Sequence, residues 1–298
     1  MLLNFSNTPL LEIIEVLQKE IASLLEHESI SFIVENPDLT TAQTHSYKTW
    51  LDLAHILKCK MLTPKQVDEQ FVEIRFQKLS ADSFHSVDAD KEQKYGNESI
   101  FSKINKNEET SFIYHYSQAL KNVKVGQRKR ILNLGVNNGD EFEVIEQLAS
   151  NFTELELLGI DYCDSAIEDA KQKFQEHKNV TFLQADINEL NTLELGEFDL
   201  IISIGTLQSS NLNFNEVFMS IVQNQLSPNG AIILGFPNCR WIDGEMIYGA
   251  MMRNYNYSEM SNLYKDVIYC KKYLQQKKFR VTITGKDYIF LSATSIRK

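Results

Sequence analysis

The 298-residue sequence contains little cysteine, and its four cysteines lie far apart. They form no Cys-x-x-Cys pair and have no neighbouring histidine. This spacing argues against a structural zinc site and against a disulfide framework, so we expect no metal site. A reducing cytoplasm is the simplest setting for such a chain.

The signals for membrane insertion and export are also missing. No uninterrupted apolar stretch approaches the roughly 20 residues that a membrane-spanning helix needs. Glu12 and Glu15 interrupt the early apolar residues, so the N-terminus lacks the basic-then-apolar order of a signal peptide. We therefore expect a soluble, cytoplasmic protein with no membrane partner.

Positive charge is in deficit. Lys and Arg total 30 against 40 Asp and Glu, which gives a net charge of −10 at pH 7. This balance disfavours non-specific binding to nucleic acid. Basic residues nevertheless gather at 121–130 and 271–280, so an RNA or acidic protein substrate stays possible if these segments converge on one face. The alternative is that they are exposed cations near helix C-termini.

The first third of the chain shows helical spacing of apolar residues. This spacing predicts helices over 10–26 and 44–57, and a third over 63–79 in which Pro64 occupies the first helical position. Residues 80–109 are polar and irregular, as in a loop or a flap. We therefore expect residues 1–110 to form an α-helical N-terminal subdomain, either a lid or a substrate-recognition module.

From residue 131 the pattern changes to alternating strands and helices, which predicts βαβ units. The sequence predicts an α/β fold with an otherwise parallel sheet that an antiparallel strand terminates. That strand belongs to a closing hairpin over 280–293. The parallel strands are expected at 130–135, 156–160, 180–183, 199–204 and 231–236.

The stretch from Arg130 to Asp140 organises this half of the chain. An apolar run ends in Gly135, and Asn137, Asn138 and Gly139 follow before a helical pattern begins. This order is typical of a buried strand, a tight turn and a helix N-terminus. Such a turn lets a ligand approach the backbone at the carboxyl end of a sheet.

The motifs of residues 111–298 resemble those of class I S-adenosylmethionine-dependent methyltransferases. The resemblance implies a doubly wound, seven-stranded, mostly parallel sheet whose last strand is antiparallel. The first motif of that family is an acidic residue followed by alternating glycines, and here it reads Asn133-Leu-Gly135-Val-Asn137-Asn-Gly139. Asn133 replaces the acid and Asn137 the middle glycine. Asparagine tolerates a left-handed backbone better than other non-glycine residues, so Asn137 can keep the turn. The resemblance implies that S-adenosyl-L-methionine is the cofactor.

Two aspartates extend the resemblance. Asp161 follows the glycine turn by about 20 residues, where an acid can accept both hydroxyls of a ribose. The resemblance implies that Asp186 binds the adenine amine. Alternatively, each aspartate is only a helix cap or a solvated loop residue. Four further cofactor contacts are expected at Tyr162, Ile187, Ser203 and Gly205.

The methyl acceptor is less well indicated. The sequence lacks the Asn/Asp-Pro-Pro-aromatic segment that marks methylation of base or glutamine amines. His115 is the candidate general base. Arg240 beside Trp241 could hold a carboxylate or phosphate, or form a surface salt bridge. The candidate substrate residues are Tyr95, Tyr114, Thr206, Gln208, Asn238, Arg240, Trp241 and Tyr248.

These features together predict an S-adenosylmethionine-dependent methyltransferase that acts on a small molecule by direct in-line transfer. One alternative is an RNA or protein methyltransferase, and another is a catalytically silent cofactor-binding scaffold. An oxidoreductase would need Gly-x-Gly-x-x-Gly after the first strand, which the segment from Gly135 to Gly139 does not supply. The oligomeric state is left open.

Overall fold

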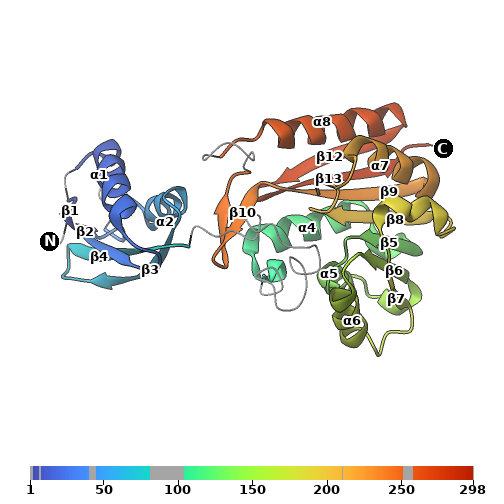
Figure 1. The fold of residues 1–298 in the computed structure, drawn as a ribbon, viewed down its shortest axis with the longest axis horizontal. Coiled ribbons are helices and arrows are strands. Elements are labelled where there is room, and N and C mark those ends of the chain that lie inside the picture. Colours follow the sequence, from blue (N-terminus) through green and yellow to red (C-terminus); the bar gives the residue numbers. More distant parts are fainter. Residues whose placement is uncertain are drawn as a thin grey trace. The chain divides into compact units, whose positions relative to one another are not determined.

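The computed structural model describes residues 3–6, 8–39, 45–80, 104–209, 211–250 and 258–297. The chain divides into two compact units. The N-terminal unit comprises Met1–Asp88 and Arg240–Tyr248, and the C-terminal unit comprises Ala89–Cys239 and Gly249–Lys298. Figure 1 shows the elements of both units, which are described separately below.

The C-terminal unit is built on a seven-stranded sheet in the order β12-β13-β9-β8-β5-β6-β7. β13 runs antiparallel to both of its neighbours, and the pairs among the other strands are parallel. This confirms the predicted fold class and places the antiparallel strand inside the sheet, between β9 and β12. The strands are β5 (Arg130–Leu134), β6 (Glu156–Asp161), β7 (Val180–Gln184), β8 (Phe198–Ile204), β9 (Leu226–Pro237), β12 (Phe279–Gly285) and β13 (Tyr288–Ser295).

Helices cover both faces of this sheet because their apolar residues repeat at helical spacing. On one face, Phe112 of α4 packs edge-on against Phe290 of β13, with ring centroids 5.6 Å apart. On the other face, Leu274 of α8 joins the core that contains Leu291. The helices are α4 (Thr110–Asn122), α5 (Asp140–Leu148), α6 (Asp164–Lys173), α7 (Phe214–Ser220) and α8 (Ser261–Gln276).

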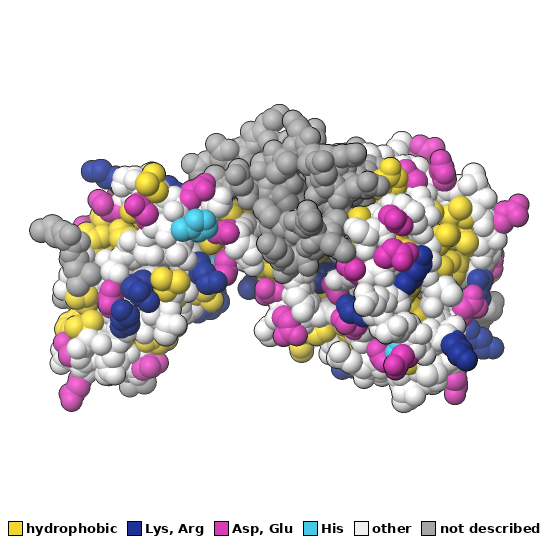
Figure 2. Space-filling model, turned by 60° about the horizontal axis from the view of Figure 1, so that its bottom comes forward, with side chains coloured by type: hydrophobic (Ala, Val, Ile, Leu, Met, Phe, Trp, Pro, Cys, Tyr) yellow, Lys and Arg dark blue, Asp and Glu magenta, His cyan; other side chains and the backbone are white. Residues whose placement is uncertain are grey.

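Short helical turns complete the C-terminal unit. The 3-10 turns are η2 (Lys106–Glu108), η3 (Val125–Gln127), η4 (Phe152–Glu154) and η5 (Ile187–Thr192), and a π-helical turn, η6 (Ile221–Gln225), extends α7. On the face of the molecule in Figure 2, acidic and basic side chains are interspersed. In the described part of the chain, no helix combines the length and apolarity needed to cross a membrane.

The N-terminal unit contains a four-stranded sheet in the order β1-β2-β4-β3. Two helices pack on it through Leu17 and Trp50, which share one buried cluster with Phe32 and Phe76 of the sheet. The elements are β1 (Leu3–Asn4), α1 (Leu10–Ser23), β2 (Ser29–Glu35), α2 (Tyr47–Ile56), β3 (Cys59–Gln66) and β4 (Phe71–Lys78). The expected helices over 10–26 and 44–57 are therefore present, with shorter bounds.

The predicted helix over 63–79 is wrong, and so is the expectation of an all-helical N-terminal subdomain. Most of that segment belongs to β3 and β4, which form an antiparallel hairpin. Asp68 closes the turn, since its Oδ1 accepts hydrogen bonds from the backbone N–H groups of Gln70 and Phe71. Pro64 lies where the register shifts, between Leu62 and Lys65. A proline there fits a bulge because it has no N–H to donate to the ladder.

A second hairpin, β10 (Cys239–Ile242) and β11 (Glu245–Tyr248), follows β9 in the sequence. All but its first residue belongs to the N-terminal unit. The Nζ of Lys60 lies 2.5 Å from Oε1 of Glu245, and Ile242 and Ile247 pack with Leu79. The segment Arg240–Tyr248, which follows β9 in the sequence, therefore completes the N-terminal unit.

Candidate functional site

The glycine turn after β5 has the backbone conformation that its sequence suggests. Gly135, Asn137 and Gly139 all have positive φ, at 75°, 47° and 88°. The N–H of Gly135 donates to the carbonyl of Ile160 at 2.8 Å, which ties the turn to β6. A Cβ on Gly135 would collide with the side chain of Thr206, which follows β8. The turn therefore depends on glycine for both conformation and space.

Asp161, at the end of β6, faces this turn. Its Oδ2 accepts the backbone N–H of Asn137 at 2.9 Å, and its Oδ1 accepts that of Cys163 at 3.0 Å. Burial raises the pKa of the Asp161 carboxyl, although these backbone donors and the nearby Lys106 ammonium oppose the rise. The backbone N–H of Tyr162 also donates to this carboxylate, which retains acceptor capacity for a ligand hydroxyl.

A buried carboxylate lies beneath the turn even though position 133 carries none. Asn133 is fully buried, and its Nδ2 donates to Oε2 of Glu141 at 3.2 Å. The other oxygen of Glu141 accepts from Nζ of Lys106 at 2.6 Å. The side chains of Glu141 and Lys106 are only 1% and 12% exposed. Glu141 on α5 thus places a buried carboxylate next to Asn133.

The ammonium of Lys106 is held in its charged form. Burial alone would lower the pKa of Lys106, but the carboxylates of Glu141, Asp140 and Asp161 outweigh burial and raise it. Asp140 in turn pairs with Lys173, whose Nζ lies 3.0 Å from Oδ1. Neither Lys106 nor Glu141 was expected as a site residue from the sequence. Glu141 does carry a local signal, because it follows Gly139 by two positions in the first turn of α5.

Two buried polar atoms lie at the carboxyl ends of adjacent strands. They are Oδ1 of Asn133 on β5 and Oγ of Ser203 on β8, and neither has a hydrogen-bond partner among the described residues. Ser203 pairs with Leu134, whereas Asn133 pairs with Ile202, so the two polar side chains lie on opposite faces of the sheet. Each of the two atoms retains the capacity to accept a hydrogen bond.

The residues expected around the adenine lie at the ends of β6 and β7. Asp161 pairs with Gln184 in the ladder, which brings the two loops side by side. Asp186 caps η5, because its Oδ1 accepts the backbone N–H of Asn188 at 2.9 Å. Ile187 is buried, whereas the Tyr162 side chain is 47% exposed. The cap uses only Oδ1 of Asp186. Its Oδ2 can still accept a hydrogen bond from the adenine amine, so the two roles are compatible.

The candidate substrate residues are dispersed. Thr206 lies against Gly135, and Gly205 is tied to β9 through its N–H, which donates to the carbonyl of Gly235 at 2.9 Å. Gln208 is exposed. Asn238 is buried and donates through Nδ2 to the carbonyl of Lys286 at 3.0 Å, so its amide fixes a loop.

The other candidates belong to the N-terminal unit, lie on α4 or fall outside the described residues. Arg240, Trp241 and Tyr248 belong to the N-terminal unit, and Tyr95 lies outside the described residues. Tyr114 and the half-buried His115 lie on α4, with ring centroids 5.2 Å apart. Tyr114 is exposed.

Comparison with known proteins agrees with this geometry. The sequence model of a family described as "Methyltransferase domain" matches residues 126–284, which span β5 to β12. The chain belongs to the class I S-adenosylmethionine-dependent methyltransferases. The matched segment contains the glycine turn, Asp161, Asp186 and both buried polar atoms.

Several relatives of this methyltransferase are known. Carboxy-S-adenosyl-L-methionine synthase of Helicobacter pylori strain G27 is 27% identical over 157 residues, which cover 51% of this chain and 63% of that protein. The synthase of strain P12 is 28% identical over 140 residues, covering 45% and 56%. The match thus spans less than two thirds of these relatives.

Among solved structures, the N-methyltransferase NodS of Bradyrhizobium japonicum WM9, in complex with S-adenosyl-L-homocysteine, is similar with a TM-score of 0.46 and 16% identity. The similar region covers 64% of this chain and 90% of NodS.

Proposed function

We propose that this protein transfers the methyl group of S-adenosylmethionine to a small-molecule acceptor. The observation that carries the proposal is the hydrogen bond between the glycine turn and the Asp161 carboxylate at the carboxyl ends of β5 and β6, next to the unsatisfied Oδ1 of the buried Asn133. A nucleoside bearing an amino-acid group matches this set, since it has a ribose diol, an ammonium and a carboxylate.

Each part of the cofactor has residues that would hold it. Asp161 would accept hydrogen bonds from the ribose hydroxyls, and Asp186 with Ile187 would bind the adenine. The acceptor atom of Asn133 would receive a hydrogen bond from the ammonium, and Ser203 is a further proposed cofactor contact. Lys106, whose charge acts on Asp161, would attract the carboxylate. The remaining cofactor contacts that we propose are at Tyr162 and Gly205.

The bound cofactor supplies an electrophilic methyl group on a sulfonium centre. The protein then contributes position and exclusion of water, from which much of the rate of such a transfer comes. Thr206 lies against Gly135 and is our candidate for orienting the acceptor. A base is required only for an acceptor proton of high pKa, and His115 remains the candidate for that role.

We assign acceptor recognition to the N-terminal unit. Support comes from its composition, because the hairpin after β9 that carries Arg240, Trp241 and Tyr248 belongs to this unit. Burial lowers the pKa of the Arg240 guanidinium, which still leaves it cationic at neutral pH. A small acceptor with a carboxylate or phosphate would suit it. The four cysteines are free and buried, which supports a reducing, cytoplasmic setting.

Calorimetry on the purified full-length protein tests the proposal. We expect S-adenosylmethionine and S-adenosylhomocysteine both to bind with one site per chain. If the folded protein binds neither ligand, the proposal is wrong. Mass spectrometry of S-adenosylmethionine incubated with the protein, with and without candidate methyl acceptors and small carboxylic acids as carboxyl donors, separates the remaining readings. Binding without conversion indicates a scaffold, and a cofactor heavier by one carboxyl group indicates the activity named for the Helicobacter relatives.

A further inference from the structure

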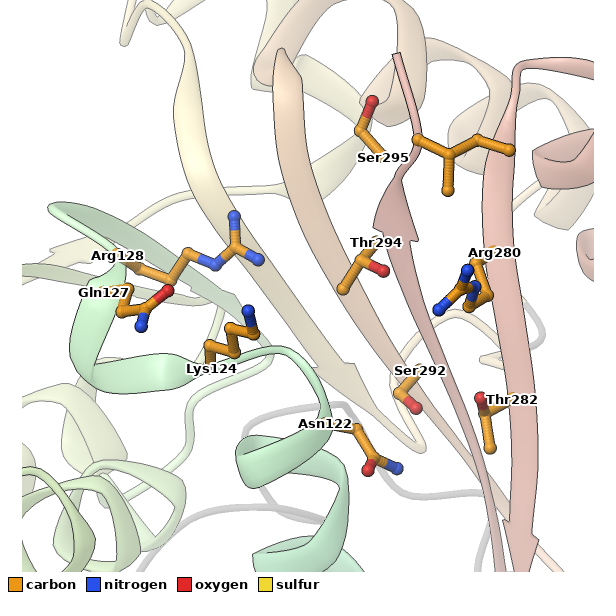
Figure 3. A pocket seen from close by; sticks show the side chains of 10 residues that line it. Asn122, Lys124, Gln127, Arg128, Arg280, Thr282, Ser292, Thr294 and Ser295 are labelled. Carbon is orange, nitrogen blue, oxygen red and sulfur yellow. The ribbon is translucent and has the colours of Figure 1, made fainter. Parts of the chain in front are cut away.

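A cavity opens at the edge of the seven-stranded sheet where the parallel strands begin, opposite the edge that carries the glycine turn. Its volume is about 580 Å³. It lies wholly within the C-terminal unit, between the end of α4 and the hairpin of β12 and β13 (Figure 3). The charged and hydroxyl-bearing side chains that line it include Lys124, Arg128, Arg280, Thr282, Ser292 and Thr294.

The strand register builds one wall of this cavity. Arg280 pairs with Thr294 and Thr282 pairs with Ser292, so all four side chains share one face of the hairpin. Further along the same face, Phe290 packs against α4. Because α4 ends at Asn122, it does not cover the last two pairs, and their polar side chains are left facing the cavity.

The opposite wall comes from the connection between α4 and β5. Lys124 adopts a left-handed conformation, with φ of 54°, which is uncommon for a lysine and turns the chain across the sheet. Arg128 is fixed by two backbone acceptors: its Nε donates to the carbonyl of Val123 at 2.8 Å and its Nη1 to that of Asn229 at 3.2 Å. Figure 3 shows Arg128 and Lys124 on one side and Arg280 on the other, with Thr294 and Ser292 between them.

The lining is cationic, although the Asp199 carboxylate, which is not a lining residue, acts electrostatically on Arg128. Three cations face the cavity, and no Asp or Glu is among the residues that line it. The negative end of the α4 dipole accounts for Lys124, which follows the helix C-terminus. It does not account for Arg280, which comes from a strand more than 150 residues later in the sequence. No hydrogen bond or ion pair of the Lys124 or Arg280 side chain is present among the described residues, so both are available to a ligand.

We propose that this cavity binds the phosphate groups of a small phosphorylated molecule, at a site separate from the methyl-transfer crevice. Arg128 supplies a preorganised guanidinium, Lys124 and Arg280 supply mobile charge, and the hydroxyls of Ser292 and Thr294 supply further donors. The volume lies within the usual range for small-ligand pockets. A nucleic acid fits less well, because no aromatic side chain lines the cavity for base stacking and the net charge of the chain is −10.

The test uses inorganic pyrophosphate as the probe and calorimetry on the full-length protein. The two pocket variants are Lys124→Asn, which keeps a residue tolerant of the left-handed backbone, and Arg280→Gln. The matched control is Lys178→Gln, which removes an exposed cation that does not line the pocket. We expect each pocket variant to weaken pyrophosphate binding by about tenfold or more, as loss of one charge-assisted hydrogen bond implies. Affinity for S-adenosylhomocysteine should not change.

Three results would overturn the proposal. One is the absence of pyrophosphate binding at millimolar concentration. Another is an equal loss in Lys178→Gln, which would indicate general charge screening. The third is tighter binding of a single-stranded RNA oligonucleotide that depends on both Lys124 and Arg280, which would make the cavity part of an RNA surface.

Discussion

The two edges of the seven-stranded sheet carry charged groups of opposite sign. Those at the carboxyl edge are buried and hydrogen-bonded, and those at the amino edge are exposed. At the carboxyl edge, Glu141 and Asp161 are enclosed by backbone donors and by the buried Lys106. At the amino edge, Lys124 and Arg280 are exposed side chains without such partners among the described residues. The charges at the carboxyl edge are therefore fixed in position at a cost in desolvation, whereas the cations at the amino edge remain exposed to solvent. Substitutions at the two edges should therefore differ in what they damage.

The largest effect is expected from Glu141→Gln, which leaves the buried Lys106 ammonium without its closest carboxylate. Removing one partner of a buried ion pair typically lowers the free energy of unfolding by about 3–5 kcal/mol. Urea unfolding would measure the loss. In the exposed pair of Lys171 and Glu168, Glu168→Gln should cost less than about 1 kcal/mol. Equal losses in the two variants would contradict the distinction between a buried network and surface charge.

A glycine pair separates steric fit from backbone strain. Gly135→Ala places a Cβ against Thr206 in a left-handed residue, whereas Gly244→Ala meets no atom within 4 Å at a similar φ of 79°. We expect about 1 kcal/mol of destabilisation from Gly244→Ala, because a left-handed alanine is strained. Gly135→Ala should cost about 2 kcal/mol or more by thermal unfolding, because the collision adds to the strain.

The same pair also tests the cofactor site. Gly135→Ala should abolish binding of S-adenosylhomocysteine, because the turn must shift, whereas Gly244→Ala should leave it unchanged. Pyrophosphate binding at the amino edge should survive both changes. Unaltered cofactor affinity in Gly135→Ala would show that the turn does not approach the ligand.

The smallest effect concerns pH. The pKa of Asp161 lies above its usual value of 3.8, mainly because the carboxyl is buried. Ribose hydroxyls donate to the ionised form, so a bound ligand should lower this pKa. Affinity is then greatest above the pKa of the free protein and falls as pH drops through it. Calorimetry with 5′-methylthioadenosine, which lacks the amino-acid group, should show this loss in the native protein and not in Asp161→Asn.

The C-terminal unit was predictable because its strands are buried on both faces. β8 and β9 contain continuous apolar runs, such as Leu200–Ile202 and Ile232–Leu234, which cannot be confused with surface helices. In the N-terminal unit, Val67, Phe71 and Ile74 also fit helical spacing. Only the buried alternation of Val72, Ile74 and Phe76, together with the turn at Asp68, shows the hairpin. The spacing of apolar residues alone does not distinguish a helix from a β-hairpin over so short a segment.

The candidate site was predictable where its residues follow strands in sequence. The glycine turn, Asp161 and Ser203 each lie at a strand end, and their order carries the information. Lys106 and Glu141 were not predicted, because they lie 35 residues apart along the chain and come together only in the tertiary structure. The sequence showed two basic segments, 121–130 and 271–280, but not whether they meet. In the structure, Lys124 from the first and Arg280 from the second line the same cavity.

Binding of S-adenosylhomocysteine to Asp161→Ala, measured by calorimetry, tests the central claim most directly. The control is Asp169→Ala, which removes an exposed carboxylate from the neighbouring helix α6. We expect Asp161→Ala to weaken binding by about 100-fold, as loss of two hydrogen bonds to a charged acceptor implies, and Asp169→Ala to have no effect. Undiminished affinity in a folded Asp161→Ala protein would contradict the assignment of the ribose site.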